Sequence, residues 1–367
     1  MVCAHRAGRA RLGGILALSV ALFCTVLTNS AAYATGASSG KCNEVKVPVT
    51  VAGLKGTIDG TLCVPEGAST LQILVPGHTF NRKMWDVSYK SDTYSYVDHA
   101  NKSGYATLAI DRLGTGTSFR PPSPLVTYES SVDTVHAVVE AAKHGNFGRQ
   151  LSKIVLVGHS MGSGIVYGEA GKYKDINGLV ILGGGHEDDL DYMLRFYVPL
   201  VRPAELDPKF AGKGYDPGYI TTIDHSVFVN KANIDPALLH LNETEFKSVD
   251  SLIALLTYFK EFPVNRTMLN LSKRINVPSI TINGSEDPFF CRGASMLPHI
   301  TDGVNPLQAP DCSSGEALAN FERPFFGPNA VVRAQVVPNA GHGVTIERTA
   351  PKFYRAATRF LDQYVGS

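Results

Sequence analysis

One serine in this chain is flanked by glycines in a pattern that can make it a nucleophile. Ser160 is the centre of GHSMG at residues 158–162, which matches the pattern GxSxG. An apolar run typical of a strand precedes it, and a stretch compatible with a helix follows it. There the serine would occupy a sharp strand-to-helix turn, and the glycines would allow close packing around it. The alternative interpretation is an ordinary turn in a glycine-rich chain.

A serine hydroxyl needs a histidine to accept its proton and an acid to orient that histidine. For this kind of turn the acid precedes the histidine in the chain. We expect His342, in PNAGHG after the last apolar run, to be the base. We expect Asp287, in NGSEDP after the preceding apolar run, to be the acid, with Glu286 as its neighbouring alternative.

Three further acids are alternative candidates for the acid that orients the histidine. Glu187, Asp188 and Asp189 also follow an apolar run, and His186 beside them raises the alternative of a metal site. A short acidic run is more typical of a solvated helix start, so we expect neither a metal nor a cofactor.

Backbone amides would have to stabilise the oxyanion that forms when a serine attacks a carbonyl. The amide of Met161, next to the nucleophile, is one expected donor. The other is expected in VPGHTF at residues 75–80, where Gly77 lets the backbone turn. His78 is the first candidate there and Thr79 the second.

Alternating and apolar runs predict the elements that position these residues. Residues 45–52 and 55–64 alternate as an antiparallel hairpin would, with its turn at Gly53. Short, almost wholly apolar runs predict central parallel strands buried on both faces. These runs are residues 71–75, 105–110, 154–157, 179–182, 279–282 and 331–337.

Helical patterns lie between these runs, after Tyr128 and at residues 161–172 and 350–364. The alternation predicts an α/β fold with a mostly parallel, doubly wound sheet. The interval 184–275 lacks a strong strand run and carries two apolar helical stripes, so we expect an inserted helical cap there. The core would then comprise residues 35–183 and 276–367.

Together these motifs make the chain similar to the α/β-hydrolase superfamily over nearly its whole mature length. The resemblance rests on residues 158–162, on PGH at 76–78, and on Asp287 and His342 in that order. A further match is DRLGTGTS at residues 111–118, which resembles the family's DRxGxGxS loop. The family's usual His-Gly is Pro76-Gly77 here, and the expected cap lies where the family commonly inserts a lid.

The resemblance also narrows the expected chemistry. Epoxide hydrolases and haloalkane dehalogenases of this fold carry an aspartate where this chain has Ser160, so acyl transfer to water remains. Carboxylic esters are the first expectation, with lactones, thioesters and amides behind them. Aromatic residues of the cap suggest an apolar pocket for a small or lipid-like ester, although they fit a core equally well: Tyr192, Phe196, Tyr197, Phe228, Tyr258 and Phe259.

Two other functions stay open at this point. A peptidase or amidase could use the same residues on the same fold. A binding protein without catalysis could also keep the scaffold, although an intact Ser, Asp and His in order argues against that.

The first 34 residues have the pattern of a secretory signal peptide. Three arginines precede an apolar run at residues 15–27, and Ala32-Tyr33-Ala34 follows it. We expect a secreted protein without a stable membrane anchor, and the alternative of a lipoprotein through Cys24 is disfavoured by Phe23. Removal of this segment leaves 31 basic and 33 acidic residues, a balance that gives no attraction for nucleic acid.

Four cysteines remain after the signal peptide, an even number that suits an oxidising compartment. Neighbours in sequence close the shortest loops, which favours the pairs Cys42 with Cys63 and Cys291 with Cys312. The alternative is a set of buried free thiols.

Overall fold

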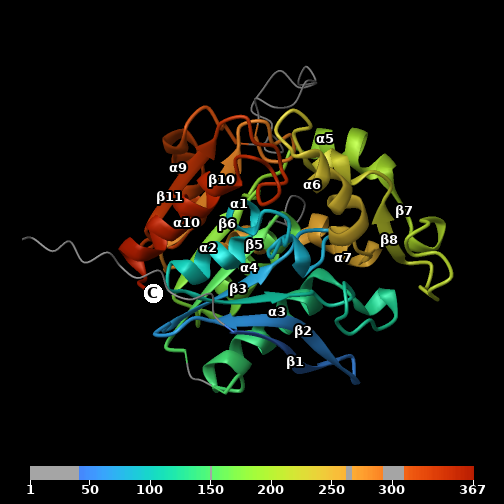
Figure 1. Ribbon diagram of the computed structural model, residues 1–367, viewed down its shortest axis with the longest axis horizontal. Coiled ribbons are helices and arrows are strands. Elements are labelled where there is room, and N and C mark those ends of the chain that lie inside the picture. The colour runs from blue at the N-terminus through green and yellow to red at the C-terminus, as the bar shows by residue number, and fades with distance from the viewer. Residues whose placement is uncertain (1–40, 149–150, 262–266, 292–309) are drawn as a thin grey trace, which may run out of the picture. The chain divides into compact units, whose positions relative to one another are not determined.

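The computed structural model describes residues 41–148, 151–261, 267–291 and 310–367 (Figure 1). The predicted signal peptide at residues 1–34 lies outside these ranges. Within them, no helix combines the length and the apolar character that crossing a bilayer requires.

An eight-stranded sheet organises the fold, in the order β1-β2-β4-β3-β5-β6-β10-β11. Its strands are β1 Lys41–Val51, β2 Leu54–Val64, β3 Thr70–Val75, β4 Ala106–Ile110, β5 Lys153–His159, β6 Gly178–Leu182, β10 Ser279–Gly284 and β11 Val332–Val337. β1 and β2 are antiparallel to their neighbours, and all other pairs are parallel. The predicted mostly parallel sheet is confirmed.

The hairpin of β1 and β2 turns at Ala52 and Gly53. Both residues have positive φ, of 48° and 83°, as a two-residue hairpin turn of the favoured type requires. The predicted hairpin is confirmed, and β1 begins four residues earlier than the alternation indicated, at Lys41.

Successive side chains of the central strands point to opposite faces of the sheet, which explains their continuous apolar runs. On β5, Ile154 and Leu156 belong to one apolar cluster, and Val155 and Val157 belong to another. Helices α3 (Tyr128–Lys143) and α4 (Met161–Tyr173) pack in the first cluster, and α2 (Tyr96–Lys102) and α10 (Ala350–Tyr364) in the second. The sheet is therefore covered on both faces, as the predicted doubly wound fold requires.

Shorter helices connect and flank these elements: α1 Ser91–Tyr94, α9 Gly315–Glu322, η1 Arg82–Met84, η2 Ser123–Leu125 and η9 Arg323–Phe325.

The interval 184–275 contains helices, as expected, although most of them are short. It also contains a small sheet, which the sequence did not predict. The helices are α5 Leu190–Tyr192, η3 Met193–Tyr197, η4 Val198–Leu200, η5 Ala204–Leu206, η6 His225–Phe228, α6 Pro236–Leu241, η7 Asn242–Phe246, α7 Leu252–Phe259 and α8 Thr267–Ser272. Strands β7 Val201–Pro203, β8 Tyr219–Thr222 and β9 Asp250–Ser251 form an antiparallel sheet. In Figure 1 the labels α5, α6, α7, β7 and β8 gather on one side of the large sheet.

The predicted cysteine pairs lie at disulfide-bonding distance. Cys42 and Cys63 are directly opposite each other in the register of β1 and β2. Cys291 and Cys312 form the second pair, whose members are 21 positions apart in sequence.

Candidate active site

Ser160 stands alone between β5, which ends at His159, and α4, which begins at Met161. Its φ of 54° and ψ of −126° lie in a strained region for a residue with a side chain. A strained turn between strand and helix is the geometry expected of a nucleophile on this kind of turn.

Close backbone approach explains the glycines around Ser160. A Cβ on Gly158 would lie 2.6 Å from the carbonyl oxygen of Gly162, and one on Gly162 would lie 2.3 Å from that of Val75. A Cβ on Gly77 would lie 2.9 Å from the Ser160 Cβ. The loop after β3 therefore rests directly against the serine.

His342 and Asp287 meet although 55 positions separate them in sequence. His342 Nδ1 lies 2.9 Å from Asp287 Oδ2, and both side chains are buried. Asp287 follows β10 and His342 follows β11, and these parallel strands are neighbours in the sheet. Their carboxyl ends place the two loops at the same edge.

The second ring nitrogen of His342, Nε2, is buried and has no hydrogen-bond partner among the described residues. With Nδ1 held by a carboxylate, Nε2 is the nitrogen that remains for chemistry. Glu286, the alternative acid, instead accepts a hydrogen bond from the Ser285 hydroxyl at the surface.

Two residues without a predicted role, His159 and Glu347, form hydrogen bonds that position the loop of His342. His159 Nε2 lies 2.9 Å from the His342 carbonyl oxygen, so the ring bonds the backbone of the loop. The Glu347 carboxylate accepts hydrogen bonds from the amides of Gly341 and Asn230, which ties the loop to the interval 184–275. Burial lowers the pKa of His159 to about 3, and the nearby His342 contributes to the same direction. His159 is therefore a neutral positioning group.

The loop at residues 76–80 turns at Thr79, whose φ is 58°. The Thr79 amide donates to Asp250 Oδ2 at 3.4 Å, and its hydroxyl contacts Thr222 and His225. The His78 ring bonds the Tyr197 hydroxyl, and burial lowers the pKa of His78 to about 4. Because the Thr79 amide donates to a carboxylate, His78 stays the first candidate for the predicted donor in this loop.

A buried ion pair holds the loop at residues 76–80 in position. Arg112 pairs with Asp250 of β9, and neither side chain is exposed. Arg112 also donates to the carbonyl oxygens of Pro76 and Gly77, at 2.8 and 2.9 Å. Burial acts to raise the pKa of Asp250, but the charges of Arg112 and His78 and the hydrogen bonds from Arg112 and the Ser251 amide together outweigh it, so the pKa is lowered. No sequence signal identified Asp250, because its partner is 138 positions away.

A small pocket of about 20 Å³ lies beside Ser160. Three of the six aromatic residues that the sequence singled out line it, namely Tyr197, Phe228 and Tyr258. Phe196 is instead exposed, whereas Tyr192 packs against it and against Phe289. The other lining residues are His78, Ser160, Met161, Met193, Leu255, Phe289 and Phe290.

The three alternative acids lie in a buried segment, so the predicted solvated helix start is wrong. Glu187, Asp188 and Asp189 are buried, because the segment packs under residues 289–290, where the Asp189 amide donates to the Phe289 carbonyl. Burial, and then the charge of Glu187, raise the pKa of Asp188 to about 8. His186 bonds Glu322 at 2.5 Å. The acid bonded to His342 is Asp287.

The comparisons with known proteins identify the family of the chain. The model of the family described as "Alpha/beta hydrolase family" matches residues 72–357. No curated protein matches the chain significantly.

Solved structures with the same fold include three hydrolases of low sequence identity. The N-acyl homoserine lactonase AidH has 14% identity and a TM-score of 0.56, over 89% of this chain and 98% of its own. A putative aryl esterase from Burkholderia cenocepacia has 15% identity and a TM-score of 0.55, over 87% and 98%. The Pyrococcus furiosus esterase PF2001 has 16% identity and a TM-score of 0.51, over 89% and 92%.

Proposed function

Because the chain belongs to the α/β hydrolase family, we propose that it is a secreted serine hydrolase that cleaves carboxylic esters. The observation that carries the proposal is the 2.9 Å contact between His342 Nδ1 and Asp287 Oδ2, in a chain whose Ser160 occupies a strained strand-to-helix turn. The structural neighbours include a putative aryl esterase and an N-acyl homoserine lactonase, which supports an ester or a lactone as the substrate.

In this proposal Ser160 Oγ attacks the ester carbonyl while His342 Nε2 accepts its proton. Asp287 accepts a hydrogen bond from the Nδ1–H group of His342, which fixes the tautomer of the histidine and stabilises the imidazolium that forms. His342 then protonates the leaving alcohol, and a water molecule hydrolyses the acyl-enzyme by the same proton relay in reverse.

The negative charge on the carbonyl oxygen would be stabilised by the backbone amides of Met161 and His78. Met161 is the first residue of α4, where backbone N–H groups lack partners within the helix. His78 lies in the loop that Arg112 and Asp250 hold against Ser160. Donors fixed before the reaction need no reorganisation when the charge develops.

The side chains that line the small pocket beside Ser160 support an uncharged, apolar ester as the substrate rather than a peptide. Its lining residues include aromatic, methionine and leucine side chains, and none of them is Asp, Glu, Lys or Arg. A peptidase that recognises a free amino terminus needs an anionic partner for that group, which these lining residues do not supply.

The test is a panel of aryl esters of increasing acyl length, run beside a lactone and an amino-acid arylamide. We expect the esters to be hydrolysed faster than the arylamide, and Ser160→Ala to reduce kcat by several orders of magnitude with folding intact. Ser163→Ala, three residues along the chain, is the matched control and should keep wild-type turnover. Preferred hydrolysis of the arylamide would instead identify a peptidase or amidase.

Secretion is the second part of the proposal, supported by the two cysteine pairs. Expression of the full chain in a secreting host should release a protein whose first residue is near Thr35. Mass spectrometry of the culture medium checks this, and retention of residues 1–34 in the released protein would contradict it.

A further inference from the structure

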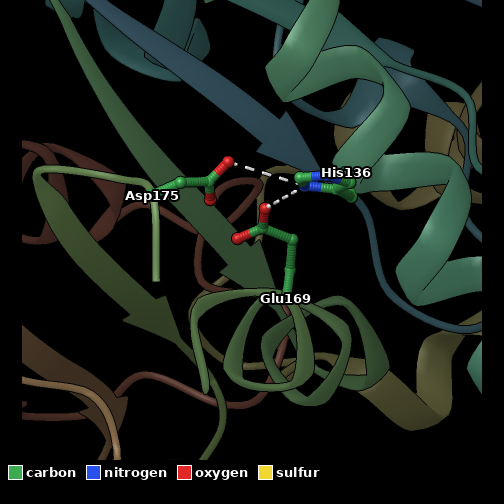
Figure 2. Close-up of side chains that lie close together, drawn as sticks. All are labelled: His136, Glu169 and Asp175. Carbon is green, nitrogen blue, oxygen red and sulfur yellow. Dashed lines mark hydrogen bonds and ion pairs between the residues drawn. The ribbon is translucent and has the colours of Figure 1, made fainter. Parts of the chain in front are cut away.

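Three side chains that could bind a metal ion converge near the C-terminal end of α4 (Figure 2). His136 comes from α3, Glu169 from α4, and Asp175 from the loop that follows α4. One ligand atom from each lies within 4.8 Å of the other two. None of the three has a role in the proposed ester hydrolysis.

Their spacing suits a small divalent ion. His136 Nδ1 lies 3.1 Å from Glu169 Oε1 and 3.6 Å from Asp175 Oδ2. Ligands bound to tetrahedral zinc at about 2.1 Å are about 3.4 Å from one another. One imidazole nitrogen with two carboxylates is also a donor set that zinc accepts, whereas calcium prefers oxygen alone.

A buried carboxylate oxygen provides a second, independent observation. The Glu169 side chain is fully buried, yet its Oε2 has no hydrogen-bond partner among the described residues. Asp175 Oδ1 is likewise buried without one. Figure 2 shows both carboxylates directed toward the His136 ring. A carboxylate that is removed from water and incompletely paired is costly unless a cation compensates it.

A neighbouring ring fixes the orientation of His136, and the site remains accessible to an ion from solvent. The Tyr173 ring stacks on His136 at 3.4 Å with an interplanar angle of 2°, which fixes the orientation of the imidazole. His136 and Asp175 are 22% and 15% exposed, so an ion can reach them from solvent. Lys143 pairs with Asp175 Oδ2 at 3.1 Å and with Glu140 at 2.7 Å. A bound ion would displace Lys143 toward Glu140.

We propose that His136, Glu169 and Asp175 form a binding site for one zinc-class divalent cation. The ion links α3 to the far end of α4, the helix that begins next to Ser160. Glu169 is eight residues from Met161, or about 12 Å along a helix. The site therefore stabilises the helix that carries the nucleophile without taking part in the chemistry.

The competing explanation is that a proton on His136, rather than a metal ion, compensates the two carboxylates. The hydrogen bond that His136 donates to Glu169 raises the pKa of His136, so an imidazolium beside the two carboxylates is the alternative explanation. That cluster binds no metal, and the two explanations give opposite results in a zinc titration.

The test is calorimetric titration of the tag-free, metal-stripped full chain with ZnCl2, with CaCl2 as the comparison. We expect one zinc ion per chain, a raised melting temperature with zinc, and much weaker calcium binding. His136→Gln should weaken zinc binding by at least about tenfold. His144→Gln changes an exposed histidine that directly follows the same helix; it is the matched control and should bind as the wild type does.

Lys143→Gln keeps the test decisive if His136→Gln does not fold. This variant removes the cation that competes for Asp175, so zinc binding should become tighter, by about threefold or more. The proposal is overturned if the wild-type chain binds no zinc. It is also overturned if folded His136→Gln or Lys143→Gln binds zinc with unchanged affinity.

Discussion

Asp287 and Asp188 each follow a strand of the large sheet, but their surroundings differ. Asp287 bonds His342, whereas Asp188 is enclosed beside Glu187 and its pKa is raised to about 8. Asp287→Asn should reduce kcat on an aryl ester by about 10³ to 10⁴, because an amide no longer fixes the tautomer of the histidine. Asp188→Asn, the matched control, should keep turnover within a few fold. A reversal of these two results would show that Asp287 is not the acid.

The raised pKa of Asp188 predicts a pH dependence of stability. The folded protein binds this proton more tightly than the unfolded chain, in which the pKa is 3.8. The contribution of Asp188 to stability is therefore fully present below pH about 4 and is lost as the pH rises toward 8. Asp188→Asn is neutral at every pH, so its free energy of unfolding should fall less than that of the wild type between pH 5 and pH 8. Urea unfolding at both pH values measures this, and parallel losses in the two proteins would contradict it.

At the scale of elements, the pair between Arg112 and Asp250 joins β9 to the loop behind Ser160. Asp250→Asn leaves the buried Arg112 charge without its partner, so we expect a loss of about 3–5 kcal/mol in the free energy of unfolding. We also expect a lower kcat, because Arg112 positions Pro76 and Gly77 beside the serine. Asp191→Asn breaks the exposed pair with Arg195 and should change stability by less than about 1 kcal/mol. Equal effects of the two substitutions would contradict this role for Asp250.

The two cysteine pairs allow a comparison of elements, because both close loops of the same sequence separation, 21 residues. Chain entropy predicts a similar loss on removal of either pair, about 3 kcal/mol. Only one pair adjoins the site, since the Cys291 amide donates to the Asp287 carbonyl oxygen. Replacing Cys291 and Cys312 by serine should therefore lower kcat more than replacing Cys42 and Cys63. Melting curves and ester turnover of both double variants test this, and equal turnover would contradict it.

At the scale of the whole molecule, the central sheet could be predicted because its signals are local. A strand buried on both faces must be apolar along its length, and that pattern is visible in residues 154–157 without knowledge of the fold. The order of Ser160, Asp287 and His342 was visible because each residue follows a strand.

The interval 184–275 could be predicted less well because its structure depends on distant contacts. The apolar stripe at residues 190–201 predicted one helix, and α5, η3 and η4 follow one another there without a gap up to β7. Only α5 is α-helical, because η3 is a π-helix and η4 a 3-10 helix, and the sequence pattern did not predict these changes of helix type. β9 has two residues, too few for a periodic pattern, and Asp250 within it is explained only by Arg112. Glu169 was equally hidden, because a single acid in a predicted helix is ordinarily a solvated residue.

The central claim is that Ser160 is a nucleophile activated by His342, and covalent labelling with a fluorophosphonate tests it most directly. The folded wild-type protein should gain one adduct, which peptide mass spectrometry should place on Ser160. Labelling should disappear in Ser160→Ala, persist in Ser163→Ala, and be lost when the protein is denatured. A folded protein that stays unlabelled, or that is labelled at another serine, would contradict the claim.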